Sequence, residues 1–223
     1  MNLRQVYPVV DANVISTDLN LNALYPKLPG LRFNHVIAPT PSITSSEVTT
    51  NTDRLILRQI RSKSDLIITT GKTARNEHLR GSKFAPMLIL TREDLVDGIP
   101  ALDESSTNEV LVTVDKTITF QNTNARSIGR VNGLLAGWLE NFLSSFGYES
   151  VVVETGLTTF KDLIQVTAFN EICLTVSGVS TQTSATEMAM EFLVANNVAN
   201  VALIQILNDG SAWFFRFQVL GSK

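Results

Sequence analysis

The sequence predicts an α/β fold, with a mixed, mostly parallel sheet that is flanked by helices and ends in an antiparallel hairpin. One basis is the alternation of short apolar segments with helix-like segments along most of the chain. A second is that residues 151–154 and 172–176 are apolar almost throughout, as in strands buried on both faces of a sheet. A third is the turn sequence Asn-Asp-Gly-Ser at 208–211, which predicts a hairpin between the last two apolar segments.

The first thirty residues show little periodicity and contain Pro8, Pro26 and Pro29, so we expect an irregular arm over 1–30. The arm is expected to pack on a single α/β domain over 31–223, because 223 residues suffice for one large domain. The expected elements of the first half are a strand at 31–38, a helix at 53–62 capped by Thr50 or Thr52, a strand at 66–70, a short helix near 74–79 and a strand at 87–91.

The strongest helical pattern lies at 126–146, where apolar side chains recur every three or four residues and Gly147 favours a helix end. Its apolar positions are Ile128, Val131, Leu135, Trp138, Leu139, Phe142 and Phe146. The other elements expected in this half are strands at 110–114 and 117–120, a strand at 151–154, a helix from a Thr159–Asp162 capping box to 166, a strand at 172–176, a helix from a Ser184–Glu187 capping box to about 195, and hairpin strands at 200–207 and 212–220.

Composition argues against several functional classes. The net charge is −3, the pI is about 5.4, and Lys and Arg are scattered, so we expect no nucleic-acid partner. No apolar run approaches the ~18 residues of a membrane span, so we expect no membrane partner. The N-terminal segment lacks an uninterrupted apolar core and a clear cleavage site, so we expect no signal peptide. Cys173 is expected to be a buried packing residue, which fits a cytoplasmic location. His35 and His78 lack neighbours at ligand spacing, so we expect no metal site.

Two strand-to-helix junctions are the most informative segments. Residues 65–75 read DLIITTGKTAR and residues 151–161 read VVVETGLTTFK, so each strand runs into Gly and Thr before a helix. Unpaired N–H groups and the helix dipole favour a phosphate at such a junction. A P-loop is not expected, because Leu66 occupies the position of its first glycine. The pair of junctions predicts a nucleotide-sized ligand across several strand ends.

With these segments placed, the chain resembles the dihydrofolate-reductase-like reductase domain of bacterial riboflavin biosynthesis, the pyrimidine reductase family. The stretches that carry the resemblance are DRLILRQIRSKSDLIITTGKTARNE, VVVETGLTTFKDLI and FNEICLTVSG. The resemblance implies an NADPH-dependent oxidoreductase that reduces the ribosyl group of a phosphoribosylaminopyrimidine by hydride transfer. It also implies a homodimer that binds a small-molecule substrate.

The resemblance assigns the cofactor to groups of residues near three strand ends. Thr70, Gly71, Thr73 and Arg75 would lie along the dinucleotide, and Thr91 and Arg92 would face the 2′-phosphate. Glu154, Thr155, Gly156, Leu157 and Thr158 would lie at the pyrophosphate. These residue types suit phosphate, because Gly permits close approach, hydroxyls donate hydrogen bonds and Arg forms charge-assisted pairs.

The substrate side departs from the family pattern. Asn34, Pro41 and Ser42 are the candidate substrate residues, but Pro41 stands where the family has an Asp. Thr155 likewise replaces the middle residue of a Glu-Gly-Gly motif. The sequence identifies no catalytic residue.

Two functional hypotheses therefore remain open. The first is the NADPH-dependent reductase; the second is a non-catalytic or repurposed dimeric relative that binds a nucleotide but has an eroded substrate site. Plainer interpretations also stand beside the site assignments. Gly71 can belong to an ordinary turn, Arg92 can be an exposed arginine, and Glu154 can be a strand-end carboxylate. Asn34 and His35 point to opposite faces of their strand, so at most one faces a given cleft.

Overall fold

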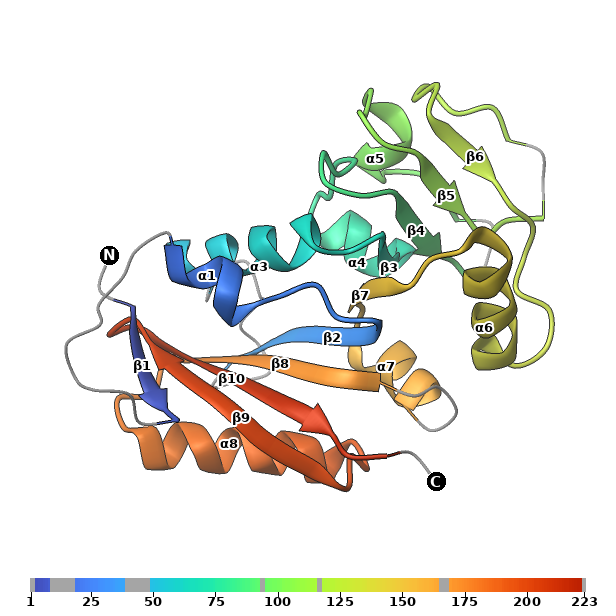
Figure 1. Ribbon diagram of the computed structural model, residues 1–223. Helices are drawn as coiled ribbons and strands as arrows, with labels where there is room; N and C mark the ends of the chain where they lie inside the picture. Colours follow the sequence, from blue (N-terminus) through green and yellow to red (C-terminus); the bar gives the residue numbers. More distant parts are fainter. Residues whose placement is uncertain are drawn as a thin grey trace. The chain divides into compact units, whose positions relative to one another are not determined.

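The computed structural model describes residues 3–8, 19–38, 49–92, 95–115, 118–164 and 169–221 (Figure 1). The chain forms two compact units by its internal contacts, one from 1–60 together with 168–223 and one from 61–167. We call these the first and the second unit. Helix α3, Asn51–Ser62, begins in the first unit and its last two residues belong to the second.

The first unit contains the antiparallel part of the sheet. Its strands lie in the order β1 (Arg4–Tyr7), β9 (Val201–Asn208), β10 (Ala212–Val219), β8 (Phe169–Ser177) and β2 (Gly30–Ile37). Strands β2 and β8 are parallel, whereas β8, β10, β9 and β1 are joined by antiparallel pairs. The predicted C-terminal hairpin is confirmed.

The turn of this hairpin depends on one carboxylate and one glycine. Asp209 accepts hydrogen bonds from the N–H groups of Ser211, at 2.9 Å, and Ala212, at 2.8 Å. Gly210 adopts a φ of 90°, which a residue with a Cβ rarely takes. The turn residues Asn, Asp and Gly therefore act here as the sequence predicts.

Residues 1–30, for which the sequence predicts an irregular arm, contain a strand and a helix. Strand β1 adds to the edge of β9, and helix α1 (Leu19–Leu24) precedes β2. Tyr25, directly after α1, is almost fully buried. A four-residue strand is too short for a periodic signal, so its pairing is a tertiary effect.

Helix α8 (Gln182–Ala195) packs on β8 and β10 through the small residues Ala185 and Ala189 and through Leu193. Thr181 caps this helix, because its hydroxyl accepts from the N–H of Ser184 at 3.2 Å. The predicted capping box that begins at Ser184 is therefore wrong. At α3 the prediction is confirmed for Thr50, whose hydroxyl accepts from the N–H of Asp53 at 3.1 Å.

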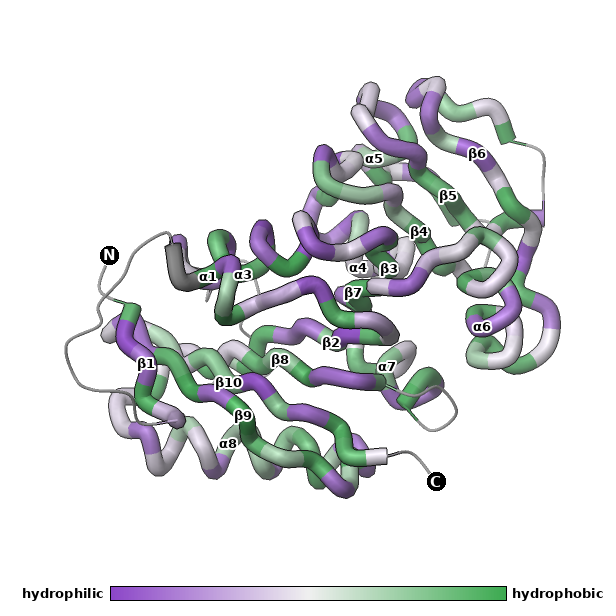
Figure 2. Tube along the Cα trace, in the orientation of Figure 1, coloured by the Kyte–Doolittle hydropathy of each residue, from purple (hydrophilic) through white to green (hydrophobic). Residues whose placement is uncertain are grey.

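The second unit is a parallel sheet. Its strands lie in the order β7 (Ser150–Glu154), β3 (Leu66–Thr70), β4 (Met87–Leu90), β5 (Val110–Val112) and β6 (Ala125–Ser127). The hydropathy colouring shows β4 and β5 as mostly apolar (Figure 2), as expected of strands with both faces covered.

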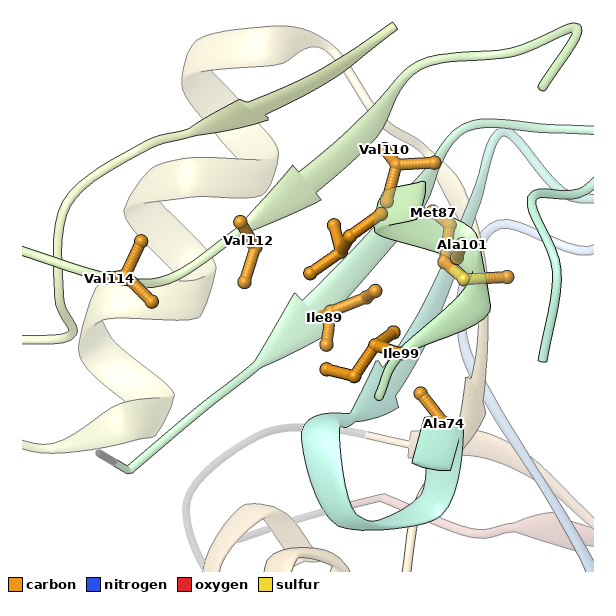
Figure 3. Close-up of a cluster of buried hydrophobic side chains, with 9 residues drawn as sticks. Ala74, Met87, Ile89, Ile99, Ala101, Val110, Val112 and Val114 are labelled. Atoms are coloured by element: carbon orange, nitrogen blue, oxygen red, sulfur yellow. The ribbon is translucent and has the colours of Figure 1, made fainter. Parts of the chain in front are cut away.

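One face of this sheet carries a buried cluster under helices α4 (Gly71–Asn76) and α5 (Pro100–Asp103). Side chains from β4 and β5 and from the segments of the two helices point toward one another there (Figure 3). The labelled members are Ala74, Met87, Ile89, Ile99, Ala101, Val110, Val112 and Val114. Because Ala74 belongs to this cluster, the cluster holds α4, the helix that follows the β3 junction, against β4.

Several predicted boundaries in the second unit are wrong. Helix α6 covers Leu135–Phe146, not 126–146, and 125–127 instead form β6. Gly129 and Gly133 have φ values of 81° and 82°, which interrupt a helix despite the apolar spacing around them. Residues 118–120 form no strand, and α5 lies inside a predicted loop. Gly147 ends α6 in a left-handed conformation, as predicted.

The two helices after the junctions begin earlier than predicted. Helix α4 begins at Gly71 rather than near 74, and α7 covers Leu157–Ile164. Thr159 therefore lies inside α7, and the capping box predicted there is wrong. Within the described part of the chain, no helix has the length and apolar character needed to cross a bilayer.

Candidate functional site

The candidate site lies where β7, β3 and β4 of the second unit end. The three strands are parallel neighbours, with Thr69 beside Glu154 and Thr70 beside Leu90. Their carboxyl ends therefore meet at one edge, which is where open α/β sheets bind ligands. The structure brings the predicted cofactor residues together at this edge, from the segments that follow β3, β4 and β7.

The junction of β3 and α4 is internally bonded. The Thr70 hydroxyl accepts from the N–H of Thr73 at 3.2 Å and lies 2.9 Å from the Thr73 hydroxyl, so Thr70 caps α4. Gly71 is buried, and a Cβ there would lie 3.2 Å from Cγ2 of Thr91. Gly71 thus permits close packing of the helix start on the end of β4.

Two further predicted residues stabilise the loop that follows β4. Arg75 donates from Nη1 to the carbonyl oxygen of Leu95 at 2.9 Å. The N–H of Thr91 donates to the Thr113 hydroxyl at 2.8 Å, and the Thr91 hydroxyl donates to the Thr113 carbonyl oxygen. These contacts fix the ends of β4 and β5 to each other, and they occupy the Thr91 hydroxyl within the protein.

Arg92 is an exposed cation of the site. Its side chain is 70% exposed, and Nη2 lies 2.7 Å from Oδ2 of Asp162 on α7. The Asp162 side chain is 49% exposed. An exposed ion pair of this kind contributes at most about 1 kcal/mol, so Arg92 can exchange this partner for another anion.

Glu154 is not free to contact a ligand as a lone carboxylate. Arg61, near the end of α3, donates to it with both nitrogens of its fork, at 2.9 Å and 2.5 Å. Burial alone would lower the pKa of Arg61, but the charge and hydrogen bonds of Glu154 offset this and raise it. The interpretation of Glu154 as a structural strand-end carboxylate is the one that these contacts favour.

The junction of β7 and α7 has the features of an anion site. Thr155 is 3% exposed, and its hydroxyl oxygen is buried without a hydrogen-bond partner among the described residues. A buried hydroxyl of this kind costs about 1–3 kcal/mol, so it calls for a partner. Gly156 is exposed with open space around its Cβ position, and Leu157 and Thr158 are exposed at the helix start. The first turn of α7 has no acidic residue. These residues fit a phosphate group.

Of the candidate substrate residues, the structure describes only Asn34. It is half-buried on β2, beside Cys173 of β8. Pro41 and Ser42 lie outside the described residues. His35 faces the other side of the strand, where its ring stacks on Phe33, with a 5.6 Å centroid separation, and on Phe192, at 5.2 Å. Burial lowers the pKa of His35 to about 4, so this side chain is neutral near pH 7.

Asp53 is a buried carboxylate that the sequence analysis treated only as the start of a helix. It is 4% exposed in the first turn of α3 and accepts a hydrogen bond from the Thr175 hydroxyl at 2.6 Å. Thr175 lies near the carboxyl end of β8, beside Val36 of β2. Asp53 and Asn34 therefore lie over the same face of the first unit's sheet. The sequence signal was an acidic residue in a first helical turn, which ordinarily stays exposed.

A second group that the sequence analysis missed is a buried ion cluster around Glu171. Arg216 donates to both oxygens of this carboxylate, at 3.1 Å and 2.6 Å, and Arg32 lies 2.8 Å from it. Burial raises the pKa of Glu171, but the Arg216 hydrogen bonds and the two guanidinium charges lower it below its usual value. Arg32 also donates to the carbonyl oxygen of Pro26 at 3.0 Å, and Arg216 donates to that of Leu24. The cluster thus anchors the segment after α1 to the sheet.

Cys173 is a buried free thiol, as expected. It lies 3.1 Å from an oxygen of Glu171, to which it donates. Burial, followed by the Glu171 charge, raises the pKa of this thiol well above its usual value. Cys173 is therefore a packing residue in its protonated form rather than a nucleophile. In the described ranges, no three His, Cys, Asp or Glu side chains gather in a way that could hold a metal ion.

The chain is similar to known proteins in structure rather than in sequence. No protein-family model matches the sequence, and no curated protein sequence matches it. Solved structures do match. A pyrimidine reductase-like protein from Corynebacterium diphtheriae has a TM-score of 0.58 at 13% identity, over 92% of this chain and 96% of that one. The riboflavin biosynthesis reductase of Saccharomyces cerevisiae has a TM-score of 0.55 at 12% identity, over 90% and 96%.

A third match is to a longer protein. The diaminohydroxyphosphoribosylaminopyrimidine deaminase/5-amino-6-(5-phosphoribosylamino)uracil reductase of Thermotoga maritima has a TM-score of 0.64 at 12% identity. The match covers 90% of this chain and 59% of that protein. The predicted fold class is confirmed. The structural neighbours of this chain are pyrimidine reductase-like proteins of riboflavin biosynthesis, and the chain shares their α/β fold.

Proposed function

We propose that the protein is an NADPH-dependent reductase, similar to 5-amino-6-(5-phosphoribosylamino)uracil reductase, that acts on a pyrimidine ribosylamine. The observation that carries the proposal is the convergence of three parallel strand ends on phosphate-binding residue types. The shared fold supports it, because proteins with this fold include reductases of such substrates by name. Fold alone does not define chemistry, so the residues of the site carry the argument.

The cofactor would be held at two points of the second unit. Thr155, Gly156 and the first turn of α7 from Leu157 would bind the pyrophosphate, since an open helix start and a buried unpartnered hydroxyl meet there. Arg92, the exposed cation after β4, would bind the 2′-phosphate. NADPH supplies the hydride for the reduction when it is bound.

The segments between these points would position the rest of the dinucleotide. Thr70 caps α4 by accepting from the N–H of Thr73, Gly71 lets that helix start approach β4, and Arg75 bonds the loop that follows β4. Their contacts with one another make this edge of the sheet rigid. We therefore assign them to shaping the site rather than to strong contacts with phosphate.

Asp53 is our candidate for the substrate-binding carboxylate of the first unit. The Thr175 hydroxyl donates to the Asp53 side chain and holds it in place. A carboxylate can accept hydrogen bonds from the N–H groups of a pyrimidine. Asn34, over the same face of the sheet, can accept or donate to ring substituents. Asp53 would thereby supply the acidic group that Pro41 removes from the family pattern.

One observation favours the alternative of a nucleotide-binding relative without catalysis. The groups expected to contact the cofactor already have partners inside the protein, since Thr70 bonds Thr73, Thr91 bonds Thr113 and Arg92 pairs with Asp162. An enzyme and a non-catalytic relative differ in whether the protein oxidises bound NADPH when a pyrimidine substrate is present. Turnover, rather than binding, separates the two.

We also propose that the protein is a cytoplasmic homodimer that associates through α6. A groove of about 670 Å³ lies along α6 and β6, lined by Trp138 and Phe142 and by Leu134, which is 80% exposed. Glu140 is the single charged residue of α6. Beside this apolar face, Arg126 pairs with Glu109. A second copy related by a twofold axis meets both charge signs at such a rim, which favours self-association.

The dimer is tested by size-exclusion chromatography with light scattering on the wild type and on Leu134→Glu. A dimeric wild type and a monomeric variant with unchanged circular dichroism support this interface. A wild type that is monomeric at about 100 μM contradicts it, because stable interfaces bind at lower concentrations.

The reductase itself is tested by anaerobic mixing of the protein, NADPH and the phosphoribosylaminopyrimidine while absorbance at the nicotinamide band is followed. Oxidation of NADPH in proportion to the ribityl product supports the enzyme. Binding of NADPH without turnover of this or related pyrimidines supports the non-catalytic relative. The control omits the pyrimidine.

A further inference from the structure

We infer that Asp162 on α7 determines cofactor selectivity by competing with the ligand phosphate for Arg92. This inference rests on the proposed function and deepens it. The Arg92 guanidinium that would face a 2′-phosphate lies 2.7 Å from the Asp162 carboxylate, in a pair joined by one hydrogen bond. Asp162 therefore occupies, with a single negative charge, the place that a phosphate would take with two.

The backbone next to Arg92 is fixed, so exchange of partners involves its side chain. Thr91 is bonded to Thr113 through its N–H at 2.8 Å and also through its hydroxyl. The Arg92 side chain is 70% exposed, which leaves room for it to rotate away from α7. A guanidinium can then form two parallel hydrogen bonds with phosphate, whereas it forms one with Asp162 in this structure.

The location of Asp162 explains why it opposes the ligand as well as holding Arg92. It lies on the helix whose first turn follows the exposed Gly156, five residues beyond Leu157. Because Asp162 lies against the Arg92 guanidinium, its carboxylate would repel a 2′-phosphate bound by that arginine, since like charges within one site disfavour each other. The predicted effect falls on NADPH, because NADH carries no 2′-phosphate.

The test compares Asp162→Asn, Arg92→Ala and the double variant by calorimetric titration with NADPH and with NADH. We expect Asp162→Asn to tighten NADPH binding by about three- to fivefold, since an exposed charge pair shifts an affinity by at most about that factor. Its NADH affinity is expected to change less than twofold. In the Arg92→Ala background, the same substitution is expected to have a much smaller effect, which a double-mutant cycle measures.

Glu187→Gln on α8 is the matched control, because it removes the same charge from an exposed helical position. Its NADPH affinity is expected to equal that of the wild type. Unchanged NADPH affinity in Asp162→Asn, with NADPH bound by the wild type, overturns the role of Asp162 and leaves the proposed function intact. Failure of every variant and the wild type to bind either nucleotide overturns both.

Discussion

Glu171→Gln removes the negative charge from the buried ion cluster of the first unit. Glu171 is 2% exposed and contacts two guanidiniums, whose side chains are 6% exposed at Arg32 and 9% exposed at Arg216. Glutamine preserves shape and one acceptor but leaves two buried positive charges without the carboxylate. Removal of one partner from a buried ion cluster typically costs about 3–5 kcal/mol. We expect a loss of that size in the free energy of unfolding.

Urea unfolding followed by tryptophan fluorescence measures this loss. Trp213 lies in β10, three residues before Arg216, and is 7% exposed, so it reports on the first unit. Glu187→Gln, on the surface of α8, serves as the control and is expected to change the free energy of unfolding by less than about 0.5 kcal/mol. A loss below about 1 kcal/mol in Glu171→Gln, with an unchanged m value, would contradict the stabilising role of this carboxylate.

The same variant has a defined pH dependence. The pKa of Glu171 is lowered in the folded protein, so the ionised carboxylate contributes stability above its ordinary pKa. That contribution is lost as the pH falls through the lowered value. The stability difference between the wild type and Glu171→Gln is therefore expected to narrow as the pH falls from about 5 toward 3. A difference that stays constant over this range contradicts the role of the charge.

Three further substitutions test the site. Asp53→Asn keeps an oxygen for the Thr175 hydroxyl but loses the negative charge. We expect kcat/KM for the pyrimidine to fall about 10- to 100-fold while the NADPH affinity is unchanged. The control Asp103→Asn, at an exposed position, is expected to change neither value. Thr155→Val is expected to leave the thermal midpoint equal or higher, because it removes a hydroxyl without a described partner; a clear decrease argues against that account. Gly71→Val is expected to lower the free energy of unfolding by about 1–3 kcal/mol through overpacking, measured in urea, and an unchanged value contradicts the close packing.

Local sequence signals were sufficient where local chemistry decides the structure. Strand β3 at Leu66–Thr70 was predicted with its observed bounds, since five residues apolar enough for burial are bounded by Asp65 and Gly71. The helix end at Gly147 and the turn at Gly210 were also predicted, because each needs a positive φ that glycine adopts readily. The predicted start of α6 was wrong, because the apolar residues around Gly129 and Gly133 are spaced as in a helix although both glycines have a positive φ.

The candidate site depends on contacts between residues far apart in sequence, and these could not be predicted. Thr175 lies 122 residues from Asp53, and Asp162 lies 70 residues from Arg92. The sequence indicated which residues end their strands, because Gly and Thr follow apolar runs. It could not indicate that Glu154 pairs with Arg61, since only the fold brings α3 to the end of β7. Partner choice in a site is a tertiary property, whereas strand-end position is largely local.

Titration of the purified wild type and of Arg92→Ala with NADPH and NADH tests whether a dinucleotide binds at the ends of β7, β3 and β4. An Arg–phosphate contact contributes about 1.5–3 kcal/mol, so we expect micromolar NADPH binding that is roughly ten- to a hundredfold tighter than NADH binding. Arg92→Ala is expected to lose this preference while it still binds NADH. Absence of binding by either nucleotide, followed by fluorescence and by calorimetry, would contradict the account.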